Sequence, residues 1–264
     1  MSLYDGTASV GEGCLRALAR AKLTLSLRVT GRRDDGYHDL EALVISVEHP
    51  HDVLTMHLLP SVGVLLTTTG PAARGIPSGR NNYDNLAAGA ALALLQVTDD
   101  AGPFAAAGFE INLHKEIPAG AGLGGGSADA AAALRAGDRL LELGLDSAAL
   151  VELAARIGSD VAFCVVGGTA WMRGRGEVVE PLPAVGALAL VVAAPAFAVS
   201  TAAVYAAWDE LGGPRSERAV DAPGAVAGLL PGGLVNDLEP AAEAVEPRLR
   251  PFREALEDVA GAPA

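Results

Sequence analysis

The sequence predicts an α+β protein, in which strands and helices follow one another without regular alternation. Alternating apolar residues near the start of the chain indicate strands, whereas alanine-rich and leucine-rich segments further on indicate helices. A glycine-rich stretch separates a strand pattern from a helix pattern between residues 118 and 127. The chain has 264 residues, half of them apolar, and we expect two domains, 1–166 and 167–264.

The first strand is predicted over residues 21–29, where apolar and polar side chains alternate with the period of a half-buried strand. Glycine and aspartate residues between 30 and 39 indicate a turn, and residues 41–58 supply one or two further strands. The core face of 21–29 would carry Leu23, Leu25, Leu27 and Val29, and its polar face Lys22, Thr24, Ser26 and Arg28.

A helix is predicted over residues 83–97, beginning at Asp84 or Asn85, because either side chain can cap the first backbone N–H groups. The segment 109–117 alternates apolar and polar residues again and indicates a strand that leads into the glycines.

Two helices are expected after the glycines. Strong helix formers run from Ser127 to about Leu143, and the polar start is suited to an N-cap. Residues 146–158 form the second predicted helix, which Asp146 or Ser147 would cap and Gly158 would end.

Asp160 follows directly, ahead of the apolar run 161–172, which predicts a buried strand. Further strands are expected around 177–182 and 187–194. A helix capped at Ser200 or Thr201 should come next, and two helical segments after residue 235 close the pattern.

Composition excludes several classes of protein. The formal charge of −13 disfavours binding to nucleic acid, which needs a broad basic face. The longest apolar stretch, 186–199, is shorter than a membrane span and contains Pro195, and residues 1–23 lack the apolar core of a secretory signal. We therefore expect a cytoplasmic protein without a membrane or nucleic-acid partner. Cys14 and Cys164 suggest no disulfide framework.

The stretch "PAGAGLGGGSADAAAALR", residues 118–135, indicates a phosphate cradle, because glycines let backbone N–H groups approach an anion at a helix start. The P-loop pattern fails, since Gly126 is followed by Ser127 and Ala128 rather than by lysine. Gly120, Gly122 and Gly125 formally meet the dinucleotide fingerprint, but the next predicted element is a helix and not a strand. A tight turn that serves helix packing is the remaining alternative.

Only two of the nineteen basic residues are lysines, Lys22 and Lys115. A compact ammonium has advantages over a planar guanidinium close to a phosphate or a reacting oxygen. Both lysines are therefore candidate functional residues.

The segment "KEIPAGAGLGGGSADAAAAL" resembles the second signature of the GHMP small-molecule kinases. "AKLTLSLRVTGRRDDGYHDL", "IGSDVAF", "GGTAWMRGRGE" and "STAAVY" are similar to segments of one member of that family, in the same order. The resemblance implies a two-domain GHMP-kinase fold with mixed sheets and helices. It also implies ATP-dependent phosphorylation of an alcohol on a cytidine-diphosphate substrate in isoprenoid biosynthesis, with Mg²⁺, by a monomer or weak homodimer.

The resemblance assigns roles to individual residues. Asp160 would be the catalytic base, and Lys22 would pair with it and stabilise the substrate oxygen. The cytidine substrate would contact Thr24, Tyr37, His38, Thr201 and Tyr205, with the base hydrogen-bonded by His38 and stacked between the two tyrosines. ATP would contact Asn85, Lys115, Pro118, Gly120, Gly122, Gly124, Gly125, Gly126, Ser127 and Asp129. The magnesium ligands stay unknown, with Ser127 as a candidate.

This chain departs from the family at Thr24, Ala128 and Ala162, where asparagine, serine and proline are usual. The family's third glycine-rich motif is absent from the C-terminal domain, which we expect to be incomplete. Two alternatives therefore stay open: a GHMP kinase for another alcohol, such as homoserine or mevalonate, and a catalytically impaired protein that binds the cytidine substrate better than it turns over ATP.

Overall fold

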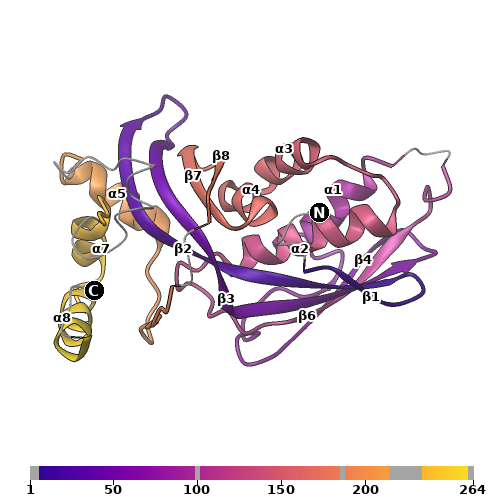
Figure 1. Cartoon of the computed structure of the whole chain (residues 1–264), viewed down its shortest axis with the longest axis horizontal. Helices are drawn as coiled ribbons and strands as arrows, with labels where there is room; N and C mark the ends of the chain where they lie inside the picture. The colour runs from indigo at the N-terminus through magenta and orange to yellow at the C-terminus, as the bar shows by residue number, and fades with distance from the viewer. Residues whose placement is uncertain (1–5, 99–101, 185–187, 214–233, 261–264) are drawn as a thin grey trace. The chain divides into compact units, whose positions relative to one another are not determined.

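The structure, a computed structural model, describes residues 6–98, 102–184, 188–213 and 234–260 (Figure 1). It divides into two compact units that are interleaved along the chain. The first comprises Met1–Leu23, Ser46–Ala119 and Leu123–Gly168, and the second Thr24–Ile45, Gly120–Gly122 and Thr169–Ala264. The predicted boundary between residues 166 and 167 stays a prediction.

The first unit is built on a mixed sheet with the strand order β1-β2-β3-β6-β4-β5. Strand β4 runs parallel to β6, whereas β3 runs antiparallel to β6. The long strands β2 and β3 contribute residues to both units. The strands are β1 (Ala8–Gly11), β2 (Cys14–Arg32), β3 (His38–Leu59), β4 (Gly63–Thr69), β5 (Gly79–Arg80) and β6 (Gly108–His114).

Helices α1 to α4, whose bounds follow, lie on one face of this sheet (Figure 1). Phe109 and Ile111 of β6 are fully buried, and a Cβ at Gly137 of α2 would lie 3.5 Å from the Phe109 ring. At Gly137 a Cβ would approach the Leu94 side chain to 2.6 Å, so glycine allows α1 and α2 to pack closely. The helices are α1 (Leu86–Leu95), α2 (Gly125–Leu140), α3 (Ser147–Ile157) and α4 (Ser159–Val166).

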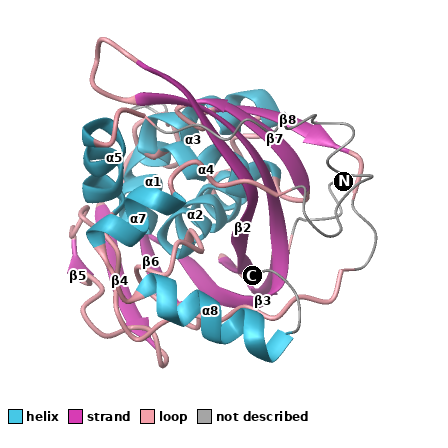
Figure 2. Cartoon of the chain, turned by 90° about the vertical axis from the view of Figure 1, so that its left-hand side faces the viewer, coloured by secondary structure: helices cyan, strands magenta, loops and turns pink. Residues whose placement is uncertain are grey.

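In the second unit, β7 (Thr169–Gly174) pairs antiparallel with the first part of β3, and β8 (Val178–Leu182) pairs with β7. The helices are α5 (Thr201–Glu210), α7 (Glu239–Val245) and α8 (Leu249–Ala260). Helices α5 and α7 pack side by side (Figures 1 and 2). Val204 and Trp208 of α5 and Ala241 of α7 form a small buried cluster with Val29 of β2.

Many of the predicted elements are confirmed. Helix α1 is capped by Asn85, whose side chain accepts a hydrogen bond from Ala87 N, and α3 is capped by Asp146 in the same way through Ala149 N. Ser200 caps α5. The apolar face predicted for the strand before the glycines is the buried face of β6.

The face predicted for the first strand is wrong at Ser26, which is buried. Its hydroxyl donates to the Val235 carbonyl at 3.1 Å and lies 3.2 Å from Val235 N, so a residue distant in sequence satisfies the polar group. The carboxylate of Asp237 likewise accepts from Val29 N at 3.0 Å. Strand β2 can therefore bury the polar Ser26, because the segment 235–237 supplies its hydrogen bonds.

The strand predicted from residue 161 is wrong over its first half, because Ser159–Val166 forms helix α4. Val161, Ala162 and Phe163 are all fully buried, so the run shows no polar face from which a helix could be read. Only from Thr169 does the chain form a strand, β7.

The strand predicted around 187–194 is absent from its described part, 188–194. No described strand pairs with these residues, and Val191 is 97% exposed. An apolar run becomes a strand only where a neighbour accepts its backbone hydrogen bonds. Residues 185–187 and the looser segment 214–233 lie outside the described residues.

Candidate functional site

The glycine loop enters helix α2 through left-handed backbone. Gly120, Gly122 and Gly124 have φ angles of 73°, 75° and 67°, which side chains with a Cβ rarely adopt. The predicted N-cap at Ser127 is wrong, because the helix begins at Gly125 and Gly124 is the capping residue. No side chain of the described residues caps this end, so backbone N–H groups of the first turn stay available to an anion.

Lys22 lies directly against this loop. Its backbone N–H donates to the Leu123 carbonyl at 2.9 Å, and a Cβ at Gly124 would come within 2.7 Å of Lys22 Cγ. Gly124 is therefore required both by its φ angle and by the lysine side chain that passes it.

The Lys22 ammonium pairs with the Asp160 carboxylate at 3.3 Å from Nζ to Oδ2. Asp160 lies in the first turn of α4, and not before a strand as predicted, so the positive end of the helix dipole also favours its negative charge. Its side chain is 38% exposed and that of Lys22 is 15% exposed. The carboxylate is thus held in place and still accessible to a substrate.

Cys164 lies one helical turn beyond Asp160. Burial, assisted by the charge of Asp160, raises the pKa of the Cys164 thiol to about 12. The thiol therefore stays neutral at physiological pH.

Lys115 is buried inside the first unit, where its ammonium contacts the carboxylates of Asp52 and Asp129. Asp52 also accepts hydrogen bonds from the backbone N–H groups of Glu116 and Ile117, at 2.5 and 2.8 Å. The cluster joins β3, the end of β6 and α2. It therefore fixes the segment from which the glycine loop begins.

Asp129 carries a buried oxygen, Oδ1, that has no hydrogen-bond partner among the described residues. Burial raises the pKa of Asp129 well above its usual range, and the Lys115 ammonium opposes that shift. The cluster reaches the start of α2, because a Cβ at Gly125 would lie 3.5 Å from the Lys115 ammonium nitrogen. The predicted ATP contacts of Lys115 and Asp129 stay predictions.

Asn85 is also committed to the fold. Its Oδ1 accepts from Ala87 N at 2.9 Å, and its Nδ2 donates to the Pro77 carbonyl at 3.1 Å. Both ends of the amide are therefore used, and the side chain is buried. The structure gives it a role as a helix cap, while its contact with ATP stays a prediction.

In the second unit, His38 is held by three side chains of helix α5. Its Nε2 lies 2.8 Å from Asp209 Oδ1. Its ring stacks on Tyr205, with centroids 4.8 Å apart and an interplanar angle of 19°, and meets the edge of Trp208 at 5.5 Å. His38 and Tyr205, predicted to contact the same base, are thus brought together.

Tyr37 is 55% exposed and lies against the Arg175 guanidinium, 4.9 Å from its ring centroid. Tyr205 stacks on His38, so the base sandwich predicted between the two tyrosines is not preformed in this arrangement. Thr24 lies on β2, Thr201 is the exposed first residue of α5, and Pro118 is exposed in the loop. The predicted ligand contacts of these residues stay predictions.

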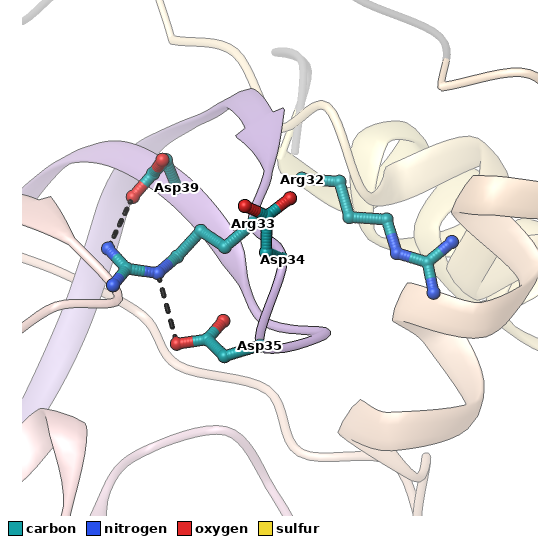
Figure 3. A pocket seen from close by; sticks show the side chains of 5 residues that line it. All are labelled: Arg32, Arg33, Asp34, Asp35 and Asp39. Atoms are coloured by element: carbon teal, nitrogen blue, oxygen red, sulfur yellow. Dashed lines mark hydrogen bonds and ion pairs between the residues drawn. The ribbon is translucent and has the colours of Figure 1, made fainter.

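Figure 3 shows an open hollow of about 440 Å³ at the end of the β2–β3 hairpin. Arg33 points toward Asp35 and Asp39 at 3.3 and 3.2 Å, whereas Arg32 extends away from them. The Tyr37 backbone N–H, together with Arg33, lowers the pKa of Asp35. Two arginines and three aspartates line the hollow, a net charge of −1, so it does not favour a phosphate.

The described residues contain no group of three or more histidine, cysteine, aspartate or glutamate side chains that could hold a metal ion. No described helix is long and apolar enough to cross a membrane.

The model for the GHMP kinases N terminal domain matches residues 85–168, which include the glycine loop, α2 and Asp160. The 4-diphosphocytidyl-2-C-methyl-D-erythritol kinase of Pelotomaculum thermopropionicum is 45% identical over 194 residues, 74% of this chain and 63% of that protein. The enzyme of the same name from Moorella thermoacetica is 42% identical over 236 residues, 88% of this chain and 78% of that protein. The chain belongs to the 4-diphosphocytidyl-2-C-methyl-D-erythritol kinases of the GHMP family.

A crystal structure of a 4-(cytidine 5′-diphospho)-2C-methyl-D-erythritol kinase has the same fold, with a TM-score of 0.66 and 32% identity. The match covers 93% of this chain and 83% of that one. The α+β, GHMP-kinase fold predicted from sequence is therefore confirmed.

Two residues of this GHMP kinase have no sequence signal that marks them. Asp52 is an isolated acid within an apolar strand pattern, 63 residues before Lys115. Asp209 lies 171 residues after His38, near the end of a helix. From the sequence alone it resembles an ordinary surface aspartate. Only the fold brings each carboxylate to its partner.

Proposed function

We propose that this chain transfers the γ-phosphoryl group of ATP to the 2-hydroxyl of 4-diphosphocytidyl-2-C-methyl-D-erythritol, a step of isoprenoid precursor biosynthesis. The observation that carries the proposal is the pair of Lys22 and Asp160, whose lysine passes the helix entrance at Gly124. Family membership supplies the substrate named for the relatives. ATP, as the co-substrate, follows from the kinase family.

Asp160 acts as the general base in this proposal. Its carboxylate accepts the proton of the 2-hydroxyl while the substrate oxygen attacks the γ-phosphorus and ADP leaves. A positioned base of this kind contributes roughly 10²- to 10⁴-fold to the rate. The 38% exposure of its side chain leaves room for the hydroxyl.

Lys22 positions Asp160 and stabilises negative charge as it develops on the substrate oxygen. Its stem is held by Gly124 and its backbone N–H by Leu123, so the ammonium is pre-oriented before substrate binds. Such pre-organisation costs no reorganisation during the reaction.

The phosphates of ATP bind the glycine loop and the first turn of α2. Backbone N–H groups and the helix dipole compensate the phosphate charge, which the strongly acidic chain as a whole does not. Ser127 is half-buried in the same turn and offers a hydroxyl oxygen, a donor of the class that magnesium takes. Mg²⁺ is held largely by phosphates and water, so a single protein hydroxyl is compatible with a magnesium site here. The ion would neutralise phosphate charge.

The cytidine half of the substrate binds in the second unit, at His38, Tyr37 and Tyr205, with Thr24 and Thr201 as further contacts. His38 and Tyr205 already form one stacked pair, which supports a shared site for a planar base. The chain acts in the cytoplasm as a monomer or weak homodimer.

The test is ADP release with 4-diphosphocytidyl-2-C-methyl-D-erythritol, ATP and magnesium, for the wild type and for Asp160→Asn. We expect the variant to lose at least about 10²-fold in kcat. Glu152→Gln is the matched control, because Glu152 is an exposed carboxylate of the neighbouring helix α3 and pairs with Arg156 at the surface. Homoserine and mevalonate are offered in parallel, and turnover of either in place of the cytidine substrate would replace the proposal.

A further inference from the structure

We propose that Asp209 is a positioning residue that fixes the tautomer of His38 and thereby selects a base with an amino group, cytosine, over one with a carbonyl, uracil. The proposal rests on the proposed function, because it takes the base site to be at His38. Asp209 touches neither substrate nor ATP in this account and acts only through the imidazole.

The His38 ring has one defined orientation. Tyr205 stacks on its face at 4.8 Å and Trp208 meets it nearly perpendicularly, at 85° and 5.5 Å. The side chain is only 7% exposed. Because the ring is enclosed, the 2.8 Å hydrogen bond between Nε2 and Asp209 Oδ1 fixes its orientation, with Nε2 toward Asp209 and Nδ1 on the opposite side of the ring.

Asp209 can only accept in this contact. Its second oxygen, Oδ2, lies 3.4 Å from the Arg32 guanidinium, which is permanently charged. A carboxylate beside a guanidinium has no proton to donate at neutral pH. The proton of the His38–Asp209 hydrogen bond therefore belongs to Nε2 of the imidazole.

A neutral imidazole has one proton, so a proton on Nε2 leaves Nδ1 as an acceptor. Cytosine presents an amino group at C4, a donor, where uracil presents a carbonyl oxygen. The Nδ1 lone pair attracts the amino group and repels the carbonyl. A buried polar group left without a partner disfavours binding by roughly ten- to hundredfold, which sets the size of the expected preference.

The tautomer is read directly by long-range ¹H–¹⁵N correlation NMR of the wild-type chain, at about pH 8.5, where histidines are generally neutral. We expect the Nε2–H tautomer for His38. The Nδ1–H tautomer would overturn the proposal without any variant, so the inference does not depend on a substitution that folds.

Asp209→Asn should reverse the tautomer. The amide oxygen would face the Arg32 guanidinium, and the amide NH₂ would then donate to His38 Nε2, which places the proton on Nδ1. Glu210→Gln is the matched control, since it neutralises the next carboxylate on the same helix, an exposed one.

Calorimetry with cytidine 5′-diphosphate and uridine 5′-diphosphate measures the outcome. The wild type and Glu210→Gln should prefer the cytidine nucleotide by roughly ten- to hundredfold, and Asp209→Asn should lose or reverse that preference. If Asp209 had only a structural role, Asp209→Asn would weaken the binding of both nucleotides equally. An unchanged ratio of the two dissociation constants in Asp209→Asn would therefore overturn this inference and leave the proposed function standing. Failure of the wild type to bind the cytidine nucleotide would instead overturn the proposed base site and this inference together.

Discussion

Lys115 and Asp52 form an ion pair in the interior of the first unit, where the side chains are only 3% and 0% exposed. Asp129 shares the same ammonium. Removing one partner of a buried charge cluster leaves the others uncompensated, which costs more than the pair contributes.

Lys115→Met should therefore lower the free energy of unfolding by about 3–5 kcal/mol, measured by urea denaturation. Glu152→Gln, which breaks an exposed pair with Arg156, should change it by less than about 0.5 kcal/mol. If Lys115→Met were as mild as this control, the buried cluster would not be a determinant of stability.

The raised pKa of Asp129 predicts the sign of a pH effect. Burial, the largest cause, makes the folded state bind a proton more tightly than the unfolded state does. The stabilising contribution is fully present below the ordinary aspartate pKa of about 4 and decreases as pH rises from there to the raised value. The free energy of unfolding of the wild type should thus fall relative to Asp129→Asn over this window, in paired urea titrations. If the wild type instead became more stable than Asp129→Asn as pH rises, the raised pKa of Asp129 would be contradicted.

Gly124→Ala tests the contact between the glycine loop and Lys22. Gly144 is the matched control, because its φ of 64° is equally left-handed while a Cβ there would meet nothing within 4 Å. Gly144→Ala should cost only the backbone strain, about 1–2 kcal/mol. Gly124→Ala should cost about 1–3 kcal/mol more, since the new methyl displaces the Lys22 stem, and should also lower kcat. Equal losses of stability and activity in the two variants would show that the position of the Lys22 side chain does not depend on the absence of a Cβ at Gly124.

Local rules limited each of three helix caps to two neighbouring residues, and the structure uses Asn85, Asp146 and Ser200. A cap can be predicted in this way because it depends only on a side chain and the N–H groups two or three residues later. The pairing of Lys22 with Asp160 was expected from a family resemblance, and the structure places the two charges 3.3 Å apart. Their catalytic roles stay a proposal.

What could not be predicted depends on tertiary neighbours. Helix α4 was mistaken for a strand because Val161, Ala162 and Phe163 are buried on every side, which erases the helical period. Lys115 is buried because it pairs with Asp52 on strand β3, and no spacing in the sequence predicts that pairing. The glycine pattern predicted the loop, but not that Gly124, rather than Ser127, would be the N-cap of the helix.

Lys22 and Asp160 should behave as one catalytic unit, because each is the other's ion-pair partner. Lys22→Met should lower kcat by about 10²- to 10³-fold, the range for removing one donor from a developing negative charge. The double variant with Asp160→Asn should be little worse than the more damaging single variant, since residues that act together lose activity together. Single-turnover rates with saturating ATP measure this, and Arg156→Gln, on the surface of α3, controls for loss of a positive charge. Losses that multiply in the double variant would mean that the two side chains act independently, with Lys22 serving the phosphates rather than the base.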